Sequence, residues 1–293
     1  MQKQNSSQQL MTGTTASIPE ASVPTLVIRP PRKWVPVDLH ELWAYRELLA
    51  AFTMRDVKLR YKQTGLGIAW AVLQPLLTMV IFTIFFGGLA HIPSDGVPYP
   101  LFVLAALLPW TLFSDGLTRS TTSMVTNSNI MTKVYFPRLI MPLASIISPL
   151  VDFSVSFIIL LAMMVYYGVA PTLNIVFLPL FILLALASSL GVGLWLSALN
   201  VKYRDFQYTV PFLIQIWMFG SPVVYSSSLV PASLRVWYGL NPMAGVIEGF
   251  RWALLGTGTP SAMVLVSVGM VILLLVSGMF YFRRMEQYYA DIV

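Results

Sequence analysis

The side chains that combine a charged type with an unusual position in this sequence are two acids, Asp115 and Asp152, which both lie inside long apolar runs. At the centre of a helix that crosses a membrane, a charge costs about 2.5–3.5 kcal/mol. Asp115 has Arg119 one helical turn later, so we expect a structural ion pair there. Asp152 has no basic residue nearby in its own helix, and an intramembrane acid of this kind usually faces a bundle interior or a wet pathway. We interpret Asp152 as a functional candidate, with a hydrogen bond to Ser or Asn of a neighbouring helix as the alternative.

The residue types that catalysis or metal binding needs are scarce in the rest of the chain. Cysteine is absent, which excludes disulfides and thiolate chemistry, and His40 and His91 are the two histidines, too few for an expected metal site. No Gly-Lys dipeptide occurs, so the phosphate-binding loop of a P-loop ATPase is excluded. The acids and histidines form no evident nucleophile and base set. We therefore expect no catalytic residue, no metal and no cofactor in this chain.

The composition is that of a membrane protein. Hydrophobic residues make up 57% of the chain, charged residues only 10%, and the mean hydropathy is +0.74, whereas soluble domains carry about 25% charged residues. The net charge of +6 does not indicate nucleic-acid binding, because the basic residues lie beside apolar runs and form no interleaved patch. The polar N-terminus lacks a signal-peptide core, so we expect it to stay inside. The predicted class is an all-α polytopic membrane protein.

The charge-free runs locate the expected spans. Arg55, Lys58, Arg60 and Lys62 precede an uncharged stretch from Gln63 to Ser94, as at a span that leaves the cytoplasm. Six spans are predicted, at about 68–90, 101–118, 139–166, 174–199, 208–225 and 262–282. Nine of the 18 Lys and Arg then precede the first span, seven more fall on the same side, and only Arg235 and Arg251 lie outside. This segregation places both termini in the cytoplasm.

Two segments flank the first span on the N-terminal side. Residues 1–38 are rich in Ser, Gln, Thr and Pro, and we expect a disordered cytoplasmic tail, with the membrane domain covering 39–293. Over residues 41–54, Leu42, Tyr45, Leu49 and Phe52 follow the spacing of one helical face. This predicts an amphipathic helix at the cytoplasmic interface. A soluble helix that packs on its own protein is the alternative.

The loops between spans contain two further candidates. The cytoplasmic segment from Arg119 to Arg138 is polar and hydroxyl-rich, and Pro137 stops any helix formed before it. It is either a plain loop or a loop with a short helix that receives force from a partner. The external segment from Tyr225 to Ser261 is largely apolar. One short helix is expected over Pro231–Tyr238, and a second begins at an Asn241 cap with Pro242 at its first position and ends before Gly256.

The two external helices have two possible placements. They either dip back into the membrane as re-entrant helices or lie on its surface as a hairpin, and re-entrant backbone requires protein or water around it. Glu248 and Arg251, at i and i+3, are expected to pair across the second helix.

Aromatic residues gather in the first and fifth spans. They include Trp70, Phe82, Phe85 and Phe86 in the first, and Phe212, Trp217, Phe219 and Tyr225 in the fifth. Lipid contact or core packing is the ordinary role of such residues. A path lined by aromatic rings also suits a glycan, because sugar rings stack their C–H faces on them.

Five stretches together resemble the membrane subunit of ABC-2 type exporters, in particular the branch that exports O-antigen, capsular polysaccharide and teichoic acid. They are RDVKLRYKQTGLGIAWAVLQPLLTMVIFTIFFG (55–87), PYPLFVLAALLPWTLFSDGLTRS (98–120), NIMTKVYFPRLIMPLA (129–144), GVGLWLSALNVKYRDF (191–206) and NPMAGVIEGFRWALLG (241–256). The resemblance runs in order from about residue 40 to the end. The polar tail lies outside it.

This resemblance implies partners and roles. The family's permeases work as homodimers with two separate ATPase subunits, which bind the ATP and Mg²⁺. The helix over 42–54 would be the gate helix, the loop over 128–137 the coupling helix that contacts the ATPase, and the helices over 231–255 the external gate. The implied site residues are Asn129, Lys133, Tyr135, Phe136 and Arg138 for coupling, Asn241, Pro242, Glu248 and Arg251 for the external gate, and Trp70, Phe82, Phe85, Phe86, Asp152, Trp217, Phe219 and Tyr225 for the substrate path.

The resemblance predicts a permease in the bacterial cytoplasmic (inner) membrane that moves a lipid-linked polysaccharide. It would act as a conduit and gate without covalent chemistry. Arg55, Lys58, Arg60 and Lys62 would meet the pyrophosphate of the lipid carrier at the entrance, although they also serve orientation. The alternatives are an exporter of a drug or small lipid and a membrane-embedded glycosyltransferase or acyltransferase.

Overall fold

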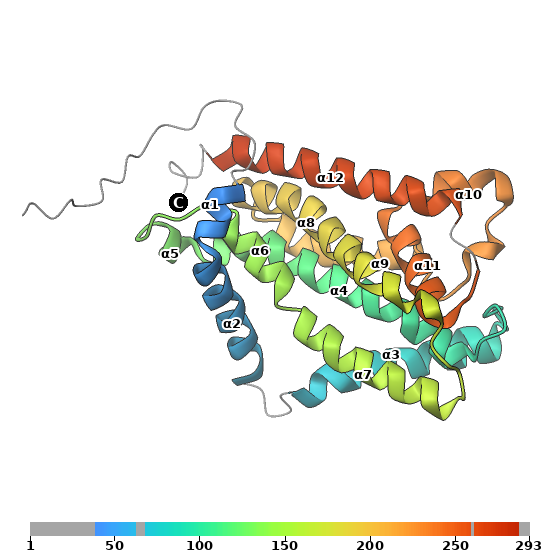
Figure 1. The fold of residues 1–293 in the computed structure, drawn as a ribbon. Helices are drawn as coiled ribbons and strands as arrows, with labels where there is room; N and C mark the ends of the chain where they lie inside the picture. The colour runs from blue at the N-terminus through green and yellow to red at the C-terminus, as the bar shows by residue number, and fades with distance from the viewer. Residues whose placement is uncertain (1–38, 63–67, 259–260, 287–293) are drawn as a thin grey trace, which may run out of the picture. The chain divides into compact units, whose positions relative to one another are not determined.

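The structure, a computed structural model, describes residues 39–62, 68–258 and 261–286, all within one compact unit, Pro36–Val293. The described residues are 81% helical and contain no strand. The expected tail over 1–38 lies outside them. The elements, drawn in Figure 1, are α1 (Leu39–Ala44), α2 (Arg46–Lys62), α3 (Ile68–Phe82), the π-helix η1 (Thr83–Leu89), α4 (Tyr99–Thr126), α5 (Ser128–Met131), α6 (Ile140–Ile147), α7 (Leu150–Tyr166), the 3-10 turn η2 (Leu173–Phe177), α8 (Leu178–Lys202), α9 (Phe206–Phe219), the 3-10 turn η3 (Ser227–Leu229), α10 (Ala232–Tyr238), α11 (Pro242–Leu255) and α12 (Ala262–Glu286).

Five of these helical segments are long and apolar enough to cross a membrane. They are Ala69–Leu89, Tyr99–Thr126, Ile140–Tyr166, Leu173–Lys202 and Ala262–Glu286. The fifth expected span, 208–225, is only partly helical, because α9 ends at Phe219 after 14 residues. At 1.5 Å per residue α9 is about 21 Å long, shorter than a bilayer core of about 30 Å.

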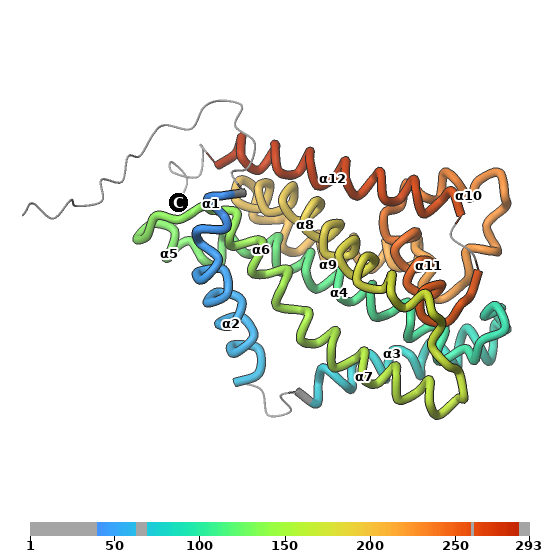
Figure 2. Tube along the Cα trace, viewed as in Figure 1, coloured from blue at the N-terminus to red at the C-terminus, as the bar shows by residue number. Residues whose placement is uncertain are grey.

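The core of the bundle is α4. Almost every side chain from Leu101 to Phe113 is buried, and α4 contacts α3, α6, α7, α8, α9 and α11. On the other side of α8 lies α12, and Figure 2 shows the two traces running alongside each other. Their backbones approach closely at Gly191 and Gly278, where an added Cβ on either glycine would collide with the backbone of the other helix. Small residues at this crossing permit the tight packing that apolar helices use inside membranes.

Many apolar side chains on the outer faces of the long helices are exposed. Leu273 of α12, Ile158 of α7 and Leu183 of α8 each expose about 60% or more of their surface. A soluble protein rarely exposes apolar area on this scale, whereas a bilayer covers it. Together with the five long apolar segments, these faces identify a multi-pass membrane protein.

The polar segment after Asp115 is more helical than expected. We predicted a loop from Arg119, but α4 continues to Thr126, and only the short helix α5 and the residues after it lie outside a long helix. The hydroxyls explain the difference. Thr118, Thr121 and Ser123 each donate to a backbone carbonyl three or four residues earlier. These Ser and Thr residues therefore satisfy their polar groups within the helix instead of breaking it.

Two other predicted helices are interrupted. The third expected span, 139–166, breaks between α6 and α7 at Ser148 and Pro149, because a proline ring clashes with the preceding helical turn. The N-terminal helix expected over 41–54 is two helices, α1 and α2, and α2 extends to Lys62. In Figure 1, α2 is steeply inclined to α4, α8 and α12.

Candidate functional site

The end of α2 carries a polar cluster that joins three helices. Arg60 Nη2 lies 3.4 Å from Asp115 Oδ2 of α4, and Arg60 Nη1 forms an ion pair with Asp152 Oδ2 in the first turn of α7. Tyr61 donates its hydroxyl proton to Asp152 Oδ1. The side chains of Arg60, Asp115 and Asp152 are 26%, 37% and 14% exposed. A partly shielded cation thus bridges two acids that are 37 positions apart in the sequence.

Tyr61 is part of this cluster, although the sequence did not single it out. Burial, and then its hydrogen bond to Asp152, raise the pKa of Tyr61 to about 12. The phenol therefore remains protonated and keeps donating at physiological pH. Its position beside Arg60 in the basic stretch was the available signal, but nothing in the spacing connects it with Asp152, 91 residues away.

The cluster corrects the predicted partner of Asp115 and the alternative considered for Asp152. Asp115 forms its ion pair with Arg60 of α2 and not with Arg119, for which no ion pair within 4.0 Å occurs in the described part of the chain. Asp152 is held by Arg60 and Tyr61 instead of by Ser or Asn of a neighbouring helix. Both acids therefore have a cationic partner, which lowers the cost of placing them in an apolar bundle.

The four basic residues of α2 point to different surroundings. Arg55 pairs with Asp56 at 2.8 Å and donates to Asn127 Oδ1 at 2.8 Å, so it reaches toward the end of α4. Lys58 and Lys62 are exposed, whereas Arg60 turns toward the two acids. The structure therefore does not bring the four cations together as one cluster.

The segment expected to contact an ATPase packs on α2 and also presents exposed side chains. Phe136 is buried and its ring lies 5.6 Å from that of Phe52 in α2, centroid to centroid. Asn129, Lys133 and Tyr135 are exposed. Arg138, the remaining predicted member, donates to the carbonyl of Glu286 at 2.8 Å, at the end of α12.

The eight residues predicted for the substrate path do not form one lining in a single chain. Trp70, Phe85 and Phe219 are each about half exposed, and Phe82 packs edge-to-face on Phe86 with ring centroids 5.6 Å apart. Asp152 belongs to the cluster at the end of α2. Trp217 and Tyr225 take part in hydrogen bonds at the end of α9.

These hydrogen bonds satisfy backbone carbonyls at the end of α9, where the helix of the fifth expected span stops. The last turn of a helix leaves carbonyls without intrahelical partners. Tyr225 donates to the Phe219 carbonyl at 3.2 Å, and Tyr238 and Asn241 donate to the Gly220 carbonyl at 3.0 and 3.1 Å. Asn241 Oδ1 also accepts from Trp217 Nε1 at 2.9 Å and caps α11 through the Met243 amide. One Asn side chain therefore joins the end of α9 to the start of α11.

The expected caps of α11 are present, whereas the expected surface pair is not. Pro242 occupies the first turn and Gly256 ends the helix in the left-handed conformation, with φ of 71°. Arg251, which we expected on the surface with Glu248, is only 4% exposed. Its guanidinium donates to the carbonyls of Phe102, Pro222 and Val223 at 3.0, 2.7 and 2.7 Å. The prediction of a surface pair is wrong because Arg251 points inward.

The Arg251 guanidinium lies in a cage of carbonyl oxygens. It also lies over the Phe102 ring, 3.5 Å from the centroid, which adds a cation–π contact. Burial lowers the pKa of Arg251 to about 9. Arg251 therefore keeps its charge at neutral pH and ties α11 to α4 and to the segment that follows α9.

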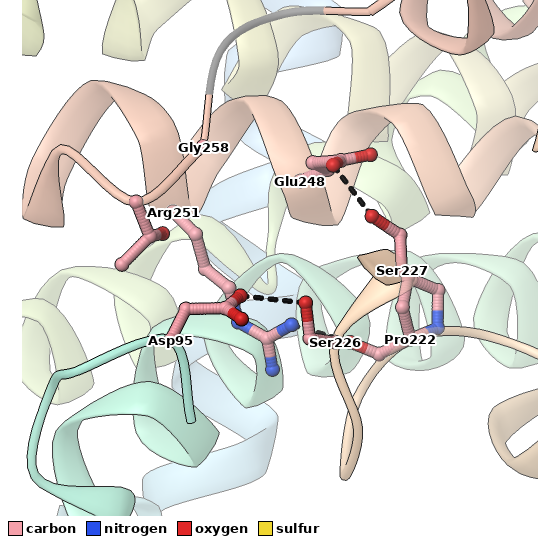
Figure 3. A pocket seen from close by; sticks show the side chains of 8 residues that line it. Asp95, Pro222, Ser226, Ser227, Glu248, Arg251 and Gly258 are labelled. Atoms are coloured by element: carbon pink, nitrogen blue, oxygen red, sulfur yellow. Dashed lines mark hydrogen bonds between the residues drawn. The ribbon is translucent and has the colours of Figure 1, made fainter. Parts of the chain in front are cut away.

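A small polar cavity lies beside Arg251 and includes the predicted Glu248. Ser227 donates to Glu248 Oε1 at 2.5 Å and Ser226 donates to Asp95 Oδ2 at 2.6 Å, as Figure 3 shows. Burial raises the pKa of Glu248. The cavity has about 20 Å³ of space, room for about one water molecule. It is too small for a sugar, so we interpret it as part of the packing of the external helices.

No metal centre is visible in the described ranges. No three Asp, Glu or His side chains come together there as metal ligands. The arrangement consists of hydrogen bonds and ion pairs that hold helices in position.

Comparisons with known proteins place this arrangement in a family. Residues 47–255 match the family model described as ABC-2 type transporter. The O-antigen export system permease protein RfbA of Myxococcus xanthus is 30% identical over 85% of this chain and 96% of its own, and that of Klebsiella pneumoniae is 27% identical over 84% and 95%. The polysialic acid transport protein KpsM of Escherichia coli is 24% identical over 70% of this chain and 80% of its own. The chain therefore belongs to the ABC-2 type transporter family.

Proposed function

We propose that this chain is the permease subunit of an ABC exporter that moves a lipid-linked polysaccharide across the bacterial cytoplasmic membrane. The observation that carries the proposal is the similarity to O-antigen export permeases, which extends over nearly the whole length of the relatives. The similarity to a polysialic acid transport protein points to the same class of cargo. A separate ATPase subunit supplies ATP hydrolysis with its bound Mg²⁺, and two copies of this chain form the permease.

The proposed topology has six crossings and both termini in the cytoplasm. Five crossings are the long apolar segments, and the other consists of α9 followed by the residues from Gly220 to Tyr225. Non-helical backbone at membrane depth needs partners inside the protein. The hydrogen bonds from Tyr225, Tyr238 and Asn241 to the end of α9 provide such partners.

The external helices α10 and α11 are proposed to be re-entrant and to close the exit of the path. Twelve of the 14 residues of α11 are buried, whereas α10 has no buried residue. A helix buried to this degree is surrounded by protein, which is the condition for re-entrant backbone. We therefore propose that α11 is the fixed wall of the exit and α10 its more exposed cover.

The segment from α5 to Phe136 is the proposed contact with the ATPase. Its exposed Lys133 and Tyr135 supply a charged and an aromatic contact, and its buried Phe136 packs on α2. Motion of the ATPase is passed to α2 through this packing, and α2 borders the entrance for the lipid-linked substrate. The permease contributes a gated conduit, without covalent chemistry.

The proposal is tested by deleting the gene in the bacterium that encodes it. We expect loss of surface polysaccharide together with accumulation of lipid-linked glycan inside the cell, restored by the wild-type gene. A variant of the partner ATPase that binds ATP without hydrolysing it should give the same phenotype. Unchanged surface polysaccharide combined with new sensitivity to amphiphilic drugs would contradict the proposal and favour a drug exporter.

A further inference from the structure

The helix α2 is attached to other parts of the chain at its middle and near its C-terminal end. In its middle, Phe52 packs on Phe136, and Arg55 donates to Asn127 Oδ1 at 2.8 Å. These contacts join α2 to residues 127–136, here called the α5 segment. At its C-terminal end, Arg60 and Tyr61 bind acids of α4 and α7. A displacement of the α5 segment therefore pulls on a helix whose far end is held by ion pairs.

The charges at that far end balance. Arg119 of α4 interacts electrostatically with Arg60, Asp115, Asp152 and Asp56, and Asp56 pairs with Arg55, so three cations and three anions lie together. Removing Arg60 from the set leaves Asp115 and Asp152 with one cation between them in an apolar bundle. Because an unpaired charge there is costly, the contacts of Arg60 and Tyr61 oppose separation of α2 from α7.

The strength of these contacts suits a reversible attachment. The three side chains are 14–37% exposed, so the ion pairs are only partly shielded. Partly exposed ion pairs contribute up to about 1 kcal/mol each. The attachment thus holds α2 in place without locking it against motion driven by an ATPase.

We propose that Arg60 is the positioning residue of an ionic latch, formed with Tyr61, Asp115 and Asp152, that keeps α2 against α7 and is released once in each transport cycle. This inference rests on the proposed function as an ATP-driven exporter. When the α5 segment moves, the Phe136–Phe52 contact pulls α2, the latch opens, and the entrance beside α7 widens. When the segment returns, the two acids recapture Arg60 and the entrance closes.

The test measures the separation of α2 from α7 directly in the permease bound to its ATPase in lipid vesicles. The chain has no cysteine, so spin labels are attached through Leu59→Cys in α2 and Ser154→Cys in α7, both at exposed positions, with one doubly labelled protomer in each complex. Pulsed electron paramagnetic resonance then measures the distance between the two spin labels. We expect a short distance without nucleotide and a longer one in the ATP-trapped state.

The decisive comparison is between two neighbouring cations of α2. Arg60→Gln should show the longer distance already without nucleotide, with the detached population raised about 5-fold, the change that about 1 kcal/mol produces. Arg60→Lys should restore most of the short distance, because it keeps the charge. Lys58→Gln removes a charge from the exposed side of the same helix and should leave the distances unchanged.

Two results would overturn the latch. One is an Arg60→Gln distance distribution that matches Lys58→Gln in both states, and the other is a wild-type distance that does not respond to ATP. Should Arg60→Gln fail to fold, Asp152→Asn removes the opposite partner and carries the same expectation. If the distance responds to ATP but no polysaccharide is transported, the proposed cargo is wrong and the latch stands.

Discussion

Replacing Arg251 by methionine is predicted to weaken severely the packing of α11 against α4 and the segment that follows α9. Methionine fills a similar volume but donates nothing, so the carbonyls of Phe102, Pro222 and Val223 lose donors at 2.7–3.0 Å. Hydrogen bonds to a charged group contribute about 1.5–3 kcal/mol each. Part of this is offset because the buried guanidinium no longer has to be desolvated, which leaves a net loss of about 3–5 kcal/mol.

This loss of stability should lower the melting temperature by a measurable amount. In a domain of 150–250 residues, 1 kcal/mol shifts Tm by about 2–4 °C, so Arg251→Met should lower the apparent Tm of the detergent-solubilised protein by roughly 6–20 °C. The scan rate is kept constant, because unfolding of such a protein is often irreversible. The Tm of Arg251→Lys should lie between those of Arg251→Met and the wild type, since an ammonium keeps the charge but lacks the planar fork of donors.

Arg235 provides the matched control. It is the other external arginine and also donates to two carbonyls, those of Ser228 and Val230, at 3.1 and 3.2 Å, but it is only half-buried. Arg235→Met should cost about 1 kcal/mol, or a few degrees in Tm. If Arg251→Met melts at the same temperature as Arg235→Met, the carbonyl cage does not stabilise the external helices and the reasoning is refuted.

Three further predictions concern other parts of the chain. Gly278→Ala should lower the free energy of unfolding by about 1–3 kcal/mol, because the added Cβ would collide with a carbonyl of α8. Gly269→Ala, in open space on the same helix, should be neutral or stabilising. Equal Tm values for the two variants would contradict the close packing at Gly278. Phe136→Ala should uncouple ATP hydrolysis in the complex from transport and lower the free energy of unfolding by about 3 kcal/mol, whereas Tyr135→Ala, at an exposed position, should leave Tm unchanged. If the Phe136→Ala complex still couples hydrolysis to transport, force is not transferred through this ring. Burial raises the pKa of Glu248 above its ordinary 4.5, so its contribution to stability is complete below pH 4.5 and is lost as the pH rises through the raised pKa. When the pH is lowered from 7.5 to 5, the Tm of Glu248→Gln should therefore rise less than the Tm of the wild type. Parallel curves of Tm against pH would exclude Glu248 as the cause of the pH dependence.

The sequence predicted the helices best where the signal was local. The caps of α11 were predicted because Asn241, Pro242 and Gly256 act within one turn of the helix ends. The polar run after Arg119 misled the prediction, since Ser and Thr that favour loops in water also bond to carbonyls within a helix.

The fifth span shows a different limit. Its apolar run continues past Phe219, so hydropathy alone gives no sign that the helix stops there. Gly220 at the cap and Pro222 two residues later end the helix, and Tyr238 and Asn241, about 20 positions later, donate to the Gly220 carbonyl. The two long-range hydrogen bonds depend on the tertiary fold and cannot be predicted from a pattern along the chain.

The cluster at the end of α2 was beyond the sequence for the same reason. Asp115 and Asp152 were recognised as unusual, but Arg60 lies 55 and 92 positions before them, outside any helical period. Arg119, one turn from Asp115, was the natural partner in the sequence and is not the partner in the fold. Periodicity predicts neighbours on one helix, whereas the fold decides which helix supplies the opposite charge.

The central claim is that this permease, with a separate ATPase, carries a lipid-linked polysaccharide across the membrane. The most direct test reconstitutes both proteins in sealed vesicles and measures how much lipid-linked glycan becomes accessible to an added glycosidase on the far side. We predict that access increases with ATP, requires both subunits, and stops when the ATPase is inactivated. Glycan movement that needs no ATPase, or ATP hydrolysis that never moves the glycan, would contradict the claim.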